Sequence, residues 1–542
     1  MKKRLALILV VILAFSTIAG CSPKAAEPAA SNEAAPQAAE KKVIYALPKE
    51  PETLDPTLNV YSRSSIVLQN LFRGLYKVGP DDRPVPALAD SYTVDEAGTK
   101  YTFKIRENAK WTDGKPVTAK DFEYSWKRVL NPEVASGAAF YLYYLKNGLA
   151  YNEGKAKAED VGVKAIDDKT LEVTLENPTA YFMDLLCITA YYPVRQDIVE
   201  SGDTWTKDPS TYISDGPFML SELKAKEKYV LKKNPNYIDA DKVQLDTIEI
   251  VFIESPEAEL AAYTNDEIDV SDNISKESMT KYMNTNEFMS KNRIGTYYFD
   301  INCEKKPFDD ARVRRAFALS INREQLLKNI IQSVEKPAYG FVPYGIPHGV
   351  KTSEDYRNVV GNLFNENVEE AKKLLADAGY PNGQGMPEIQ FITMSGQLDS
   401  DIAQAIQSMW KENLGVEVSI QTFESKVYWD EIELGNFNIA RDGWTGDYPD
   451  PMTNLDLFES VNTADDIRWS SAEYDRLLAE NRAIADQTKR MDNYAKAEKI
   501  LMDEMPVIPL YFLVDTYLCK PAVKGVIKSY IGHTMFEYAT VE

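Results

Sequence analysis

Residues 100–132 read KYTFKIRENAKWTDGKPVTAKDFEYSWKRVLNP, and polar and apolar side chains alternate at the start of this stretch. Tyr101, Phe103 and Ile105 fall on one side of an extended chain, a period of two that is typical of a half-buried strand. The TDGKP that follows contains several strong turn formers. The first part of the stretch therefore predicts a strand that ends at a turn.

The second part of the same stretch has the signals of a helix. Thr118, with Asp121 three residues later, suits an N-terminal cap, because both side chains can accept free backbone N–H groups. Apolar residues then recur at helical spacing and form one stripe, which consists of Phe122, Trp126 and Val129. Pro132 has no backbone N–H, so the helix must end before it.

Helices and strands alternate along the rest of the chain. In the predicted helix 367–379, Asn367 and Glu370 have the spacing of a capping box and Gly379 suits the C-terminal end. Another amphipathic helix is predicted at residues 490–506, and strands are predicted at residues 295–302, 415–423 and 507–514. The pattern predicts an α/β or α+β fold. The roughly 500 residues after Glu40 exceed a single core, so we expect two or three lobes.

The N-terminus resembles a secretory signal. Three basic residues precede an apolar run of about 15 residues, which is shorter than the ~20 that a membrane span needs. Small residues then precede Cys21, and IAGC resembles the bacterial lipobox, in which the cysteine is lipidated. We therefore predict a signal peptide at residues 1–20 and a lipid anchor at Cys21. The alternative is an ordinary signal peptide followed by a chance cysteine.

The segment after the cysteine has the composition of a tether. Residues 22–40 contain no large apolar side chain, so they cannot form a core. A flexible chain of that length spans roughly 25 Å. We predict that residues 21–40 tether an extracytoplasmic protein to the outer face of the bacterial cytoplasmic membrane, which it contacts through its lipid anchor alone.

Charge and composition exclude several classes of function. The net charge of −22 argues against nucleic acid, because phosphate binding needs a basic patch. With only His348 and His533, an HExxH zinc site is impossible and a Ser-His-Asp triad is disfavoured. We expect free, buried thiols at the three other cysteines, which are Cys187, Cys303 and Cys519.

No enzyme or cofactor motif stands out. Gly148–Ala156 looks like a phosphate loop, but it has five residues between its glycines and Ala156 where a magnesium-binding Ser or Thr belongs. A carboxylate pair for glycoside hydrolysis stays open, because 83 acidic residues can pair in many ways. We expect no enzyme activity, no metal and no cofactor, with a surface hydrolase as the alternative.

Six stretches together resemble one family, the oligopeptide-binding (family 5) type of extracytoplasmic solute-binding lipoproteins that serve bacterial ABC importers. They occur in the family's order from about residue 43 to the C-terminus. They are Thr53–Pro56, Ile105–Pro132, Asn265–Val270, Lys306–Glu324, Ala440–Pro451 and residues 470–511. The resemblance implies a two-lobed, periplasmic-binding-protein-like α/β fold with a hinge and an extra domain inserted in the first lobe.

The resemblance also implies domain boundaries and a binding mode. The first lobe takes residues 41–72, 196–294 and 515–542, the extra domain takes 73–195, and the second lobe takes 295–514. An extended peptide lies between the lobes, which close over it.

Ala440–Pro451, ARDGWTGDYPDP, supplies most of the implied binding residues. Asp447 occupies the place of the carboxylate that pairs with the peptide's α-ammonium. Strand residues of the second lobe would bond the peptide main chain, namely Gly443, Trp444 and Thr445, and residues of the first lobe would do the same, namely Val60, Tyr61 and Ser62. The structural alternative is an Asx-turn at Asp447 and a core role for Trp444.

Two further residues carry open alternatives. Arg441 matches a buried cation of the family that can serve the peptide's C-terminus, or it forms a structural ion pair. Asn273 is a ligand candidate or part of a surface turn.

The chain departs from enteric members of the family at three places. A cysteine pair aligns with Gly295 and Thr445, so that cross-link is absent. A tyrosine of the extra domain aligns near Ala138, and a histidine that helps to hold a tetrapeptide's C-terminus aligns near Asp399. An acid at Asp399 suggests the hypothesis that longer or basic peptides are favoured.

The implied function is capture of extended oligopeptides by a monomeric lipoprotein and their delivery to the transmembrane permease subunits of an ABC importer. The alternatives within the fold are a signalling peptide, haem, nickel or an oligosaccharide. The shortage of histidine argues against nickel, and Asp447 argues against a neutral sugar, which offers no charge to a carboxylate.

Overall fold

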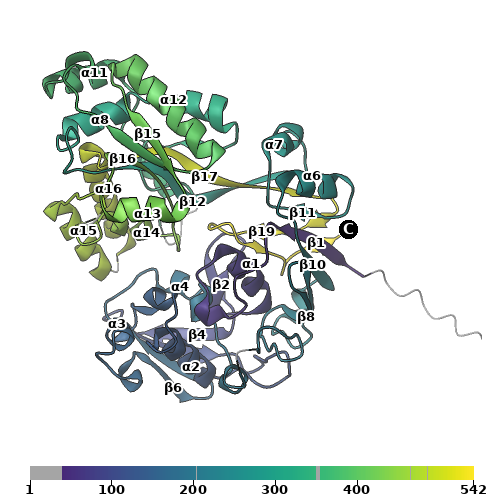
Figure 1. Cartoon of the computed structure of the whole chain (residues 1–542). Helices are drawn as coiled ribbons and strands as arrows, with labels where there is room; N and C mark the ends of the chain where they lie inside the picture. Colours follow the sequence, from purple (N-terminus) through teal and green to yellow (C-terminus); the bar gives the residue numbers. More distant parts are fainter. Residues whose placement is uncertain (1–39, 203, 350–353, 464–465, 485) are drawn as a thin grey trace, which may run out of the picture. The chain divides into compact units, whose positions relative to one another are not determined.

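Eleven strands form one mixed sheet that runs through most of the chain (Figure 1). The computed structural model describes residues 40–202, 204–349, 354–463, 466–484 and 486–542, so the predicted signal peptide and Cys21 lie outside the described residues. In spatial order the main path is β15 (Ser419–Phe423), β14 (Gln390–Met394), β16 (Ile439–Thr445), β12 (Phe288–Ile301), β17 (Val507–Cys519), β11 (Val270–Ser271), β1 (Lys42–Leu47), β10 (Thr247–Phe252), β9 (Lys228–Lys233) and β8 (Phe218–Lys224). The short β13 (Lys336–Pro337) pairs with β17 beside this path.

Two long antiparallel strands, β12 and β17, connect the halves of this sheet. The C-terminal part of β12 pairs with β16, whereas the C-terminal end of β17 pairs with β11. The β12–β17 ladder shifts register between Asn292 and Thr296, and such an irregularity bends a strand pair. The proposed lobe boundaries after residues 294 and 514 lie within these two strands. Figure 1 shows β12 and β17 running from the strands β14–β16 toward β1 and β11.

Residues 76–174 form two smaller sheets of their own. The antiparallel order β4 (Ala89–Val94), β5 (Lys100–Ile105), β7 (Thr170–Thr174), β6 (Val163–Asp167) makes one, and β2 (Tyr76–Val78) pairs with β3 (Pro84–Pro86). The predicted strand is confirmed, because Tyr101, Phe103 and Ile105 on β5 are all buried.

The predicted helix next to it is also confirmed, as α2 (Ala119–Leu130). The backbone N–H of Thr118 donates to Asp121 Oδ2 at 2.8 Å, which closes the capping box. The apolar stripe is fully buried. Trp126 also donates from Nε1 to the Tyr191 carbonyl at 2.8 Å, so the stripe anchors α2 in the core of the proposed extra domain.

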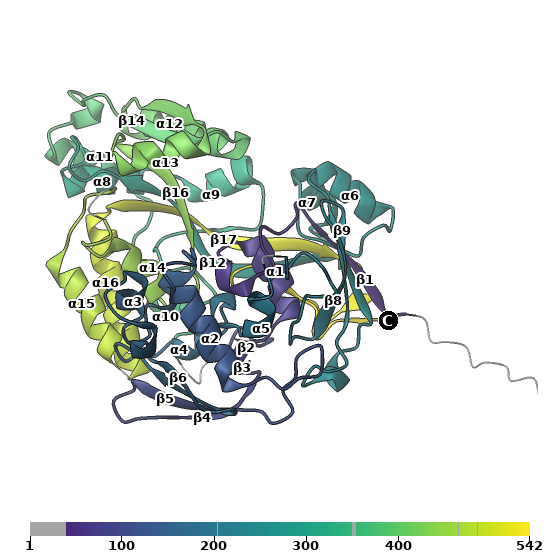
Figure 2. The same cartoon turned by 60° about the horizontal axis from the view of Figure 1, so that its bottom comes forward.

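Helices cover both faces of the sheet in the region of β14–β16. In Figures 1 and 2, α12 lies on one side of these strands, and α15 with α16 lies on the other. The predicted helices 367–379 and 490–506 correspond to α11 and α16. Besides α2, the α-helices of the described chain are α1 (Ser62–Leu71), α3 (Gly148–Asn152), α4 (Phe182–Leu185), α5 (Gln196–Val199), α6 (Pro256–Thr264), α7 (Lys276–Tyr282), α8 (Ala311–Leu319), α9 (Arg323–Leu326), α10 (Tyr356–Val360), α11 (Val368–Asp377), α12 (Gln397–Leu414), α13 (Ser425–Glu433), α14 (Met452–Leu455), α15 (Ala472–Ala483) and α16 (Gln487–Glu504).

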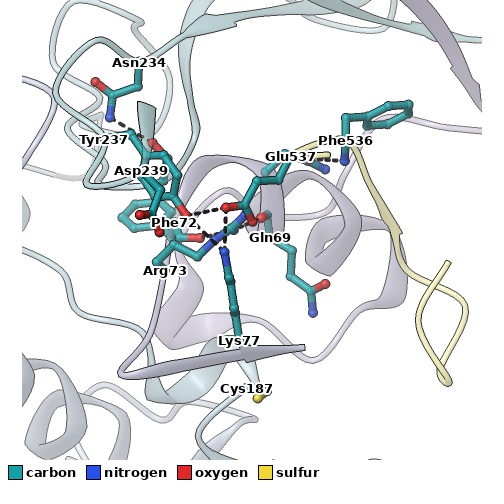
Figure 3. Close-up of polar contacts among 12 residues, drawn as sticks. Gln69, Phe72, Arg73, Lys77, Cys187, Asn234, Tyr237, Asp239, Phe536 and Glu537 are labelled. Carbon is teal, nitrogen blue, oxygen red and sulfur yellow. Dashed lines mark hydrogen bonds and ion pairs between the residues drawn. The ribbon is translucent and has the colours of Figure 1, made fainter. Parts of the chain in front are cut away.

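A buried ion network holds the C-terminal segment against the N-terminal part of the fold (Figure 3). Glu537 accepts hydrogen bonds from Lys77 Nζ at 2.5 Å, from the Tyr237 hydroxyl at 2.7 Å and from Arg73 Nη2 at 2.8 Å. All four residues are buried. A buried cation that lost its acidic partner would strongly destabilise the fold. Because Arg73 and Lys77 both pair with Glu537, the network specifies where the chain end docks.

The three described cysteines are free, as expected, but they differ in burial. Cys187 and Cys519 are buried, whereas Cys303 is only half-buried. Among the described helices, none is both long and apolar enough to cross a membrane.

Candidate functional site

The strand β16 has an open edge where the predicted binding residues lie. It pairs with β12 along its whole length, from Ile439 to Thr445. On its other side β14 reaches only Ile439 and Ala440, so within the described chain no strand pairs with the edge from Arg441 to Thr445. Unpaired N–H and C=O groups of this kind can receive an extended peptide as an added strand.

Two cavities meet beside this edge. The larger has a volume of about 620 Å³ and is lined by Gly443, Trp444 and Asp447 among others. The smaller has a volume of about 230 Å³, and its lining includes Asp447 together with Val60, Tyr61, Ser62 and Thr445. The structure thus brings together seven of the nine predicted ligand residues, and Asp447 is common to both cavities.

Asp447 is a partly buried carboxylate without a cation. Its Oδ1 accepts a hydrogen bond from the Tyr141 hydroxyl at 2.9 Å, and its backbone N–H donates to Thr453 Oγ1 at 3.0 Å. Burial raises the pKa of the Asp447 carboxyl to about 6, and the hydrogen bond from Tyr141 opposes that rise. No ion pair is formed by this carboxylate with any described residue. The Asp447 carboxylate therefore accepts from the Tyr141 hydroxyl instead of from the backbone N–H that an Asx-turn would use.

Trp444 has both a lining and a structural role. Its indole Nε1 donates to the Thr453 carbonyl at 2.7 Å, and this bond ties β16 to α14 across the intervening turn. Gly443 beside it is exposed. Since glycine has no side chain, this part of the strand lets another backbone approach closely.

The smaller cavity is also lined by the start of α1, through Val60, Tyr61 and Ser62. The Tyr61 backbone N–H donates to Asn59 Oδ1 at 2.9 Å, which fixes the turn before the helix. The side chains of Val60 and Tyr61 are 42% and 48% exposed, although both are large and apolar. Exposed apolar side chains at a cavity are typical of a ligand-binding surface.

Arg441 lines neither cavity and is already paired. Its Nε lies 3.1 Å from Asp399 Oδ1, and its guanidinium lies 4.7 Å from the centre of the Tyr297 ring. The Tyr297 hydroxyl donates to the same Asp399 oxygen at 2.8 Å. The structure therefore forms the ion pair that was the structural alternative for Arg441, and it also gives Asp399 a partner within the chain.

Asn273 also lies away from the two cavities. Its backbone N–H donates to Glu259 Oε1 at 3.1 Å, and its Nδ2 donates to the Glu254 carbonyl at 3.4 Å. These contacts belong to the segment around α6, so the structure does not bring Asn273 together with the other predicted residues.

Several lining residues were missed in the sequence. Tyr141 is the most important, and it lies three positions after Ala138, where the alignment indicated the loss of a tyrosine. The run FYLYYL at residues 140–145 was a possible signal, because clustered tyrosines often line binding surfaces. Gly295 and Thr445, the two positions of the absent cysteine pair, lie directly opposite each other on β12 and β16.

The chain is similar to known proteins over nearly its whole length. Residues 83–466 match the family model described as bacterial extracellular solute-binding proteins, family 5. The oligopeptide-binding protein OppA of Bacillus subtilis is 36% identical over 500 residues, which cover 90% of this chain and 91% of the relative.

Two solved structures show the same architecture. An oligopeptide ABC transporter substrate-binding domain from Bacillus anthracis has a TM-score of 0.75 at 32% identity and covers 93% of this chain and 99% of its own. Listeria monocytogenes OppA bound to peptide has a TM-score of 0.74 at 29% identity, with coverage of 93% and 99%. The two-lobed α/β architecture expected from the sequence is therefore shown.

Proposed function

Because the chain belongs to the bacterial extracellular solute-binding proteins of family 5, we propose that it captures extended oligopeptides between its lobes and delivers them to an ABC permease. The observation that carries this proposal is Asp447. It is a desolvated carboxylate at the junction of two cavities, it has no cation among the described residues, and it follows a strand edge with which none of the described strands pairs. A free α-ammonium supplies the missing charge, and the peptide backbone supplies the missing strand.

The named relatives support the ligand class. The Bacillus subtilis relative is named for oligopeptide binding, and the Listeria structure contains a bound peptide. Recognition of the amine and the backbone suits a protein that accepts many sequences, because every peptide offers these groups. The proposed role is capture rather than catalysis.

The N-terminal signals support a cellular location. We propose that Cys21 carries the lipid anchor and that residues 21–40 tether the folded body outside the cytoplasmic membrane. Several acyl chains, each worth about 0.8 kcal/mol per buried CH₂, make such an anchor stable. Closure of a monomer is proposed to occur by bending at β12 and β17, about the boundaries after residues 294 and 514.

Two measurements test the proposal together. Native mass spectrometry of the purified protein should show peptide masses bound to it. Calorimetry should then show that a free-amine peptide binds and that its N-acetylated form binds at least 30-fold more weakly, because acetylation removes the charge that pairs with Asp447. Equal affinities of the two forms would refute the role of the amine, and binding of sugar or haem in place of peptide would refute the ligand class.

A further inference from the structure

Among the residues that the structure describes, five aspartates line the larger cavity, and no lysine, arginine or histidine does. One of them is Asp447, which the proposed function assigns to the peptide amine. The other four are Asp300, Asp442, Asp456 and Asp466. The cavity therefore contains four acidic side chains in addition to Asp447, the carboxylate proposed to bind the peptide amine.

Asp300 and Asp442 form the deepest part of this acidic lining. They lie on neighbouring strands, and Asp442 is paired with Tyr298, two residues before Asp300, so the alternation of side chains places both acids on one face of the sheet. Asp300 is only 4% exposed. Burial and the nearby Asp442 carboxyl raise the pKa of Asp300 far above its ordinary value, and burial also raises the pKa of Asp442.

Two arginines close to this acidic lining form ion pairs with other acids. Arg441 lies on β16 next to Asp442, so its side chain projects from the opposite face of the sheet, where it pairs with Asp399. Arg482, which lies near Asp456, pairs with Glu459. The Tyr298 hydroxyl donates to Asp442 Oδ2 at 3.3 Å, which is a neutral partner and does not compensate the charge.

A metal ion does not explain these acids. Among the described residues, no three acidic, histidine or cysteine side chains are placed to hold one. The walls of the cavity are instead aromatic and include Trp429, Trp444 and Phe458, and Trp429 is 42% exposed. Aromatic faces beside carboxylates are the surroundings that a guanidinium or an alkylammonium prefers.

We propose that the larger cavity selects peptides that carry a cationic side chain, arginine or lysine, close to their free amino end. This inference rests on the proposed function, because the peptide amine at Asp447 brings the neighbouring side chain into the cavity that Asp447 lines. Asp300 and Asp442 are hydrogen-bonded to each other, and the raised pKa of Asp300 places the shared proton on that carboxyl, so the pair carries one negative charge that a cationic side chain neutralises. An acidic side chain meets like charge, and a neutral one leaves the charge of the pair uncompensated.

The test uses peptides that differ in charge but not in shape. Calorimetry on the whole chain compares Ala-Arg-Ala-Ala with Ala-citrulline-Ala-Ala, and Ala-Glu-Ala-Ala completes the series. Moving the arginine to the first and fourth positions locates the pocket. We expect the arginine peptide to bind at least tenfold more tightly than the citrulline peptide, and the glutamate peptide to bind most weakly.

Variants then assign the effect to the cavity. Asp442→Asn should reduce the arginine-to-citrulline ratio several-fold, and Asp300→Asn should reduce it less, because Asp300 holds the shared proton. The matched control Asp168→Asn, an exposed acid of the proposed extra domain, should leave the ratio unchanged. If arginine and citrulline peptides bind the wild-type protein equally, the inference is wrong while peptide binding stands. If neither binds, the proposed function itself fails. A ratio that persists in both cavity variants would place the selectivity elsewhere and overturn the assignment.

Discussion

The Tyr141 hydroxyl donates a hydrogen bond of 2.9 Å to Asp447, although 306 positions separate the two residues in the chain. Tyr141 belongs to the proposed extra domain and Asp447 to the proposed second lobe. This contact places a neutral donor beside a carboxylate that has no cation among the described residues. A peptide amine that arrives at Asp447 therefore meets an acceptor whose position is already set.

Replacing Asp447 with asparagine should weaken peptide binding strongly. The change keeps the size of the side chain and an acceptor for Tyr141 but removes the charge. An ammonium left without its partner should cost about 2–5 kcal/mol, which is roughly 30-fold to several thousand-fold in Kd. Calorimetry with one free-amine peptide measures the change, with Asp168→Asn as the control. Unchanged affinity in Asp447→Asn would remove the assignment.

Peptide affinity should fall in mildly acidic solution. Burial raises the pKa of Asp447 to about 6 in the free protein, so the carboxylate is mostly charged at pH 7.5 and mostly protonated at pH 5. The peptide amine stays protonated below its pKa of about 8. We expect Kd to rise by up to about tenfold per pH unit below pH 6. Asp447→Asn should show a much flatter profile, and an equally steep profile in that variant would trace the effect to another group.

The same carboxylate should destabilise the free protein at neutral pH. Its folded-state pKa of about 6 lies above the unfolded value, so the folded state holds the proton more tightly. The resulting stability is fully present below pH 4 and is lost as the pH rises through 6. Asp447→Asn should therefore raise the free energy of unfolding at pH 7.5 by about 1–3 kcal/mol, an interval that allows for partial exposure. Thermal unfolding without peptide measures this change, and a lower Tm in the variant would contradict the expectation.

Glu537 should be essential for stability. Glu537→Gln leaves Arg73 and Lys77 buried without their acid, which should cost about 3–5 kcal/mol. Burial alone raises the pKa of Glu537, but Arg73 and Lys77 outweigh it and lower that pKa to about 2. The stabilisation is therefore present above pH 4.5 and is lost as the pH falls through 2. Urea unfolding at pH 7 tests the variant, and Asp168→Asn should unfold like the wild type. A loss that is no larger than in this control would show that the network is dispensable.

Asp399 should influence the affinity of the protein for the C-terminal carboxylate of the peptide. Asp399→Asn removes the charge that neutralises Arg441, so a peptide whose C-terminal carboxylate reaches Arg441 should gain affinity about tenfold. Calorimetry with alanine peptides of two to six residues shows at which length the gain occurs, and Asp401→Asn on the same helix is the control. Affinities that stay constant across the length series would end the hypothesis that Asp399 influences peptide choice.

Local signals in the sequence predicted the elements well, because each of them acts within a few residues. The alternation of Tyr101, Phe103 and Ile105 predicted β5, and the Thr118–Asp121 cap predicted the start of α2. Gly379 has a positive φ of 98°, as a glycine at the end of α11 should. The two-lobed fold, by contrast, came from the resemblance to a family, since periodicity does not state which strands become neighbours.

The binding site was predicted in part for the same reason. Residues that follow one another on a strand, such as Gly443, Trp444 and Thr445, share their place in the fold as well as in the sequence. Tyr141 and the pair of Asp300 and Asp442 were missed, because their relation to the site arises only when distant segments pack together. For Arg441 the sequence left two roles open, the peptide's C-terminus or a structural ion pair, and the structure forms an ion pair with Asp399 on α12.

By itself the sequence determined many of the helices, strands and caps, since hydrogen bonds and side-chain periods within a few residues control them. Only the tertiary structure decided that β14 stops short on β16, that Tyr141 meets Asp447, and that several acids share one cavity. These features depend on which buried surfaces fit against one another over hundreds of residues. Such long-range packing is a property of the whole fold and leaves no local pattern.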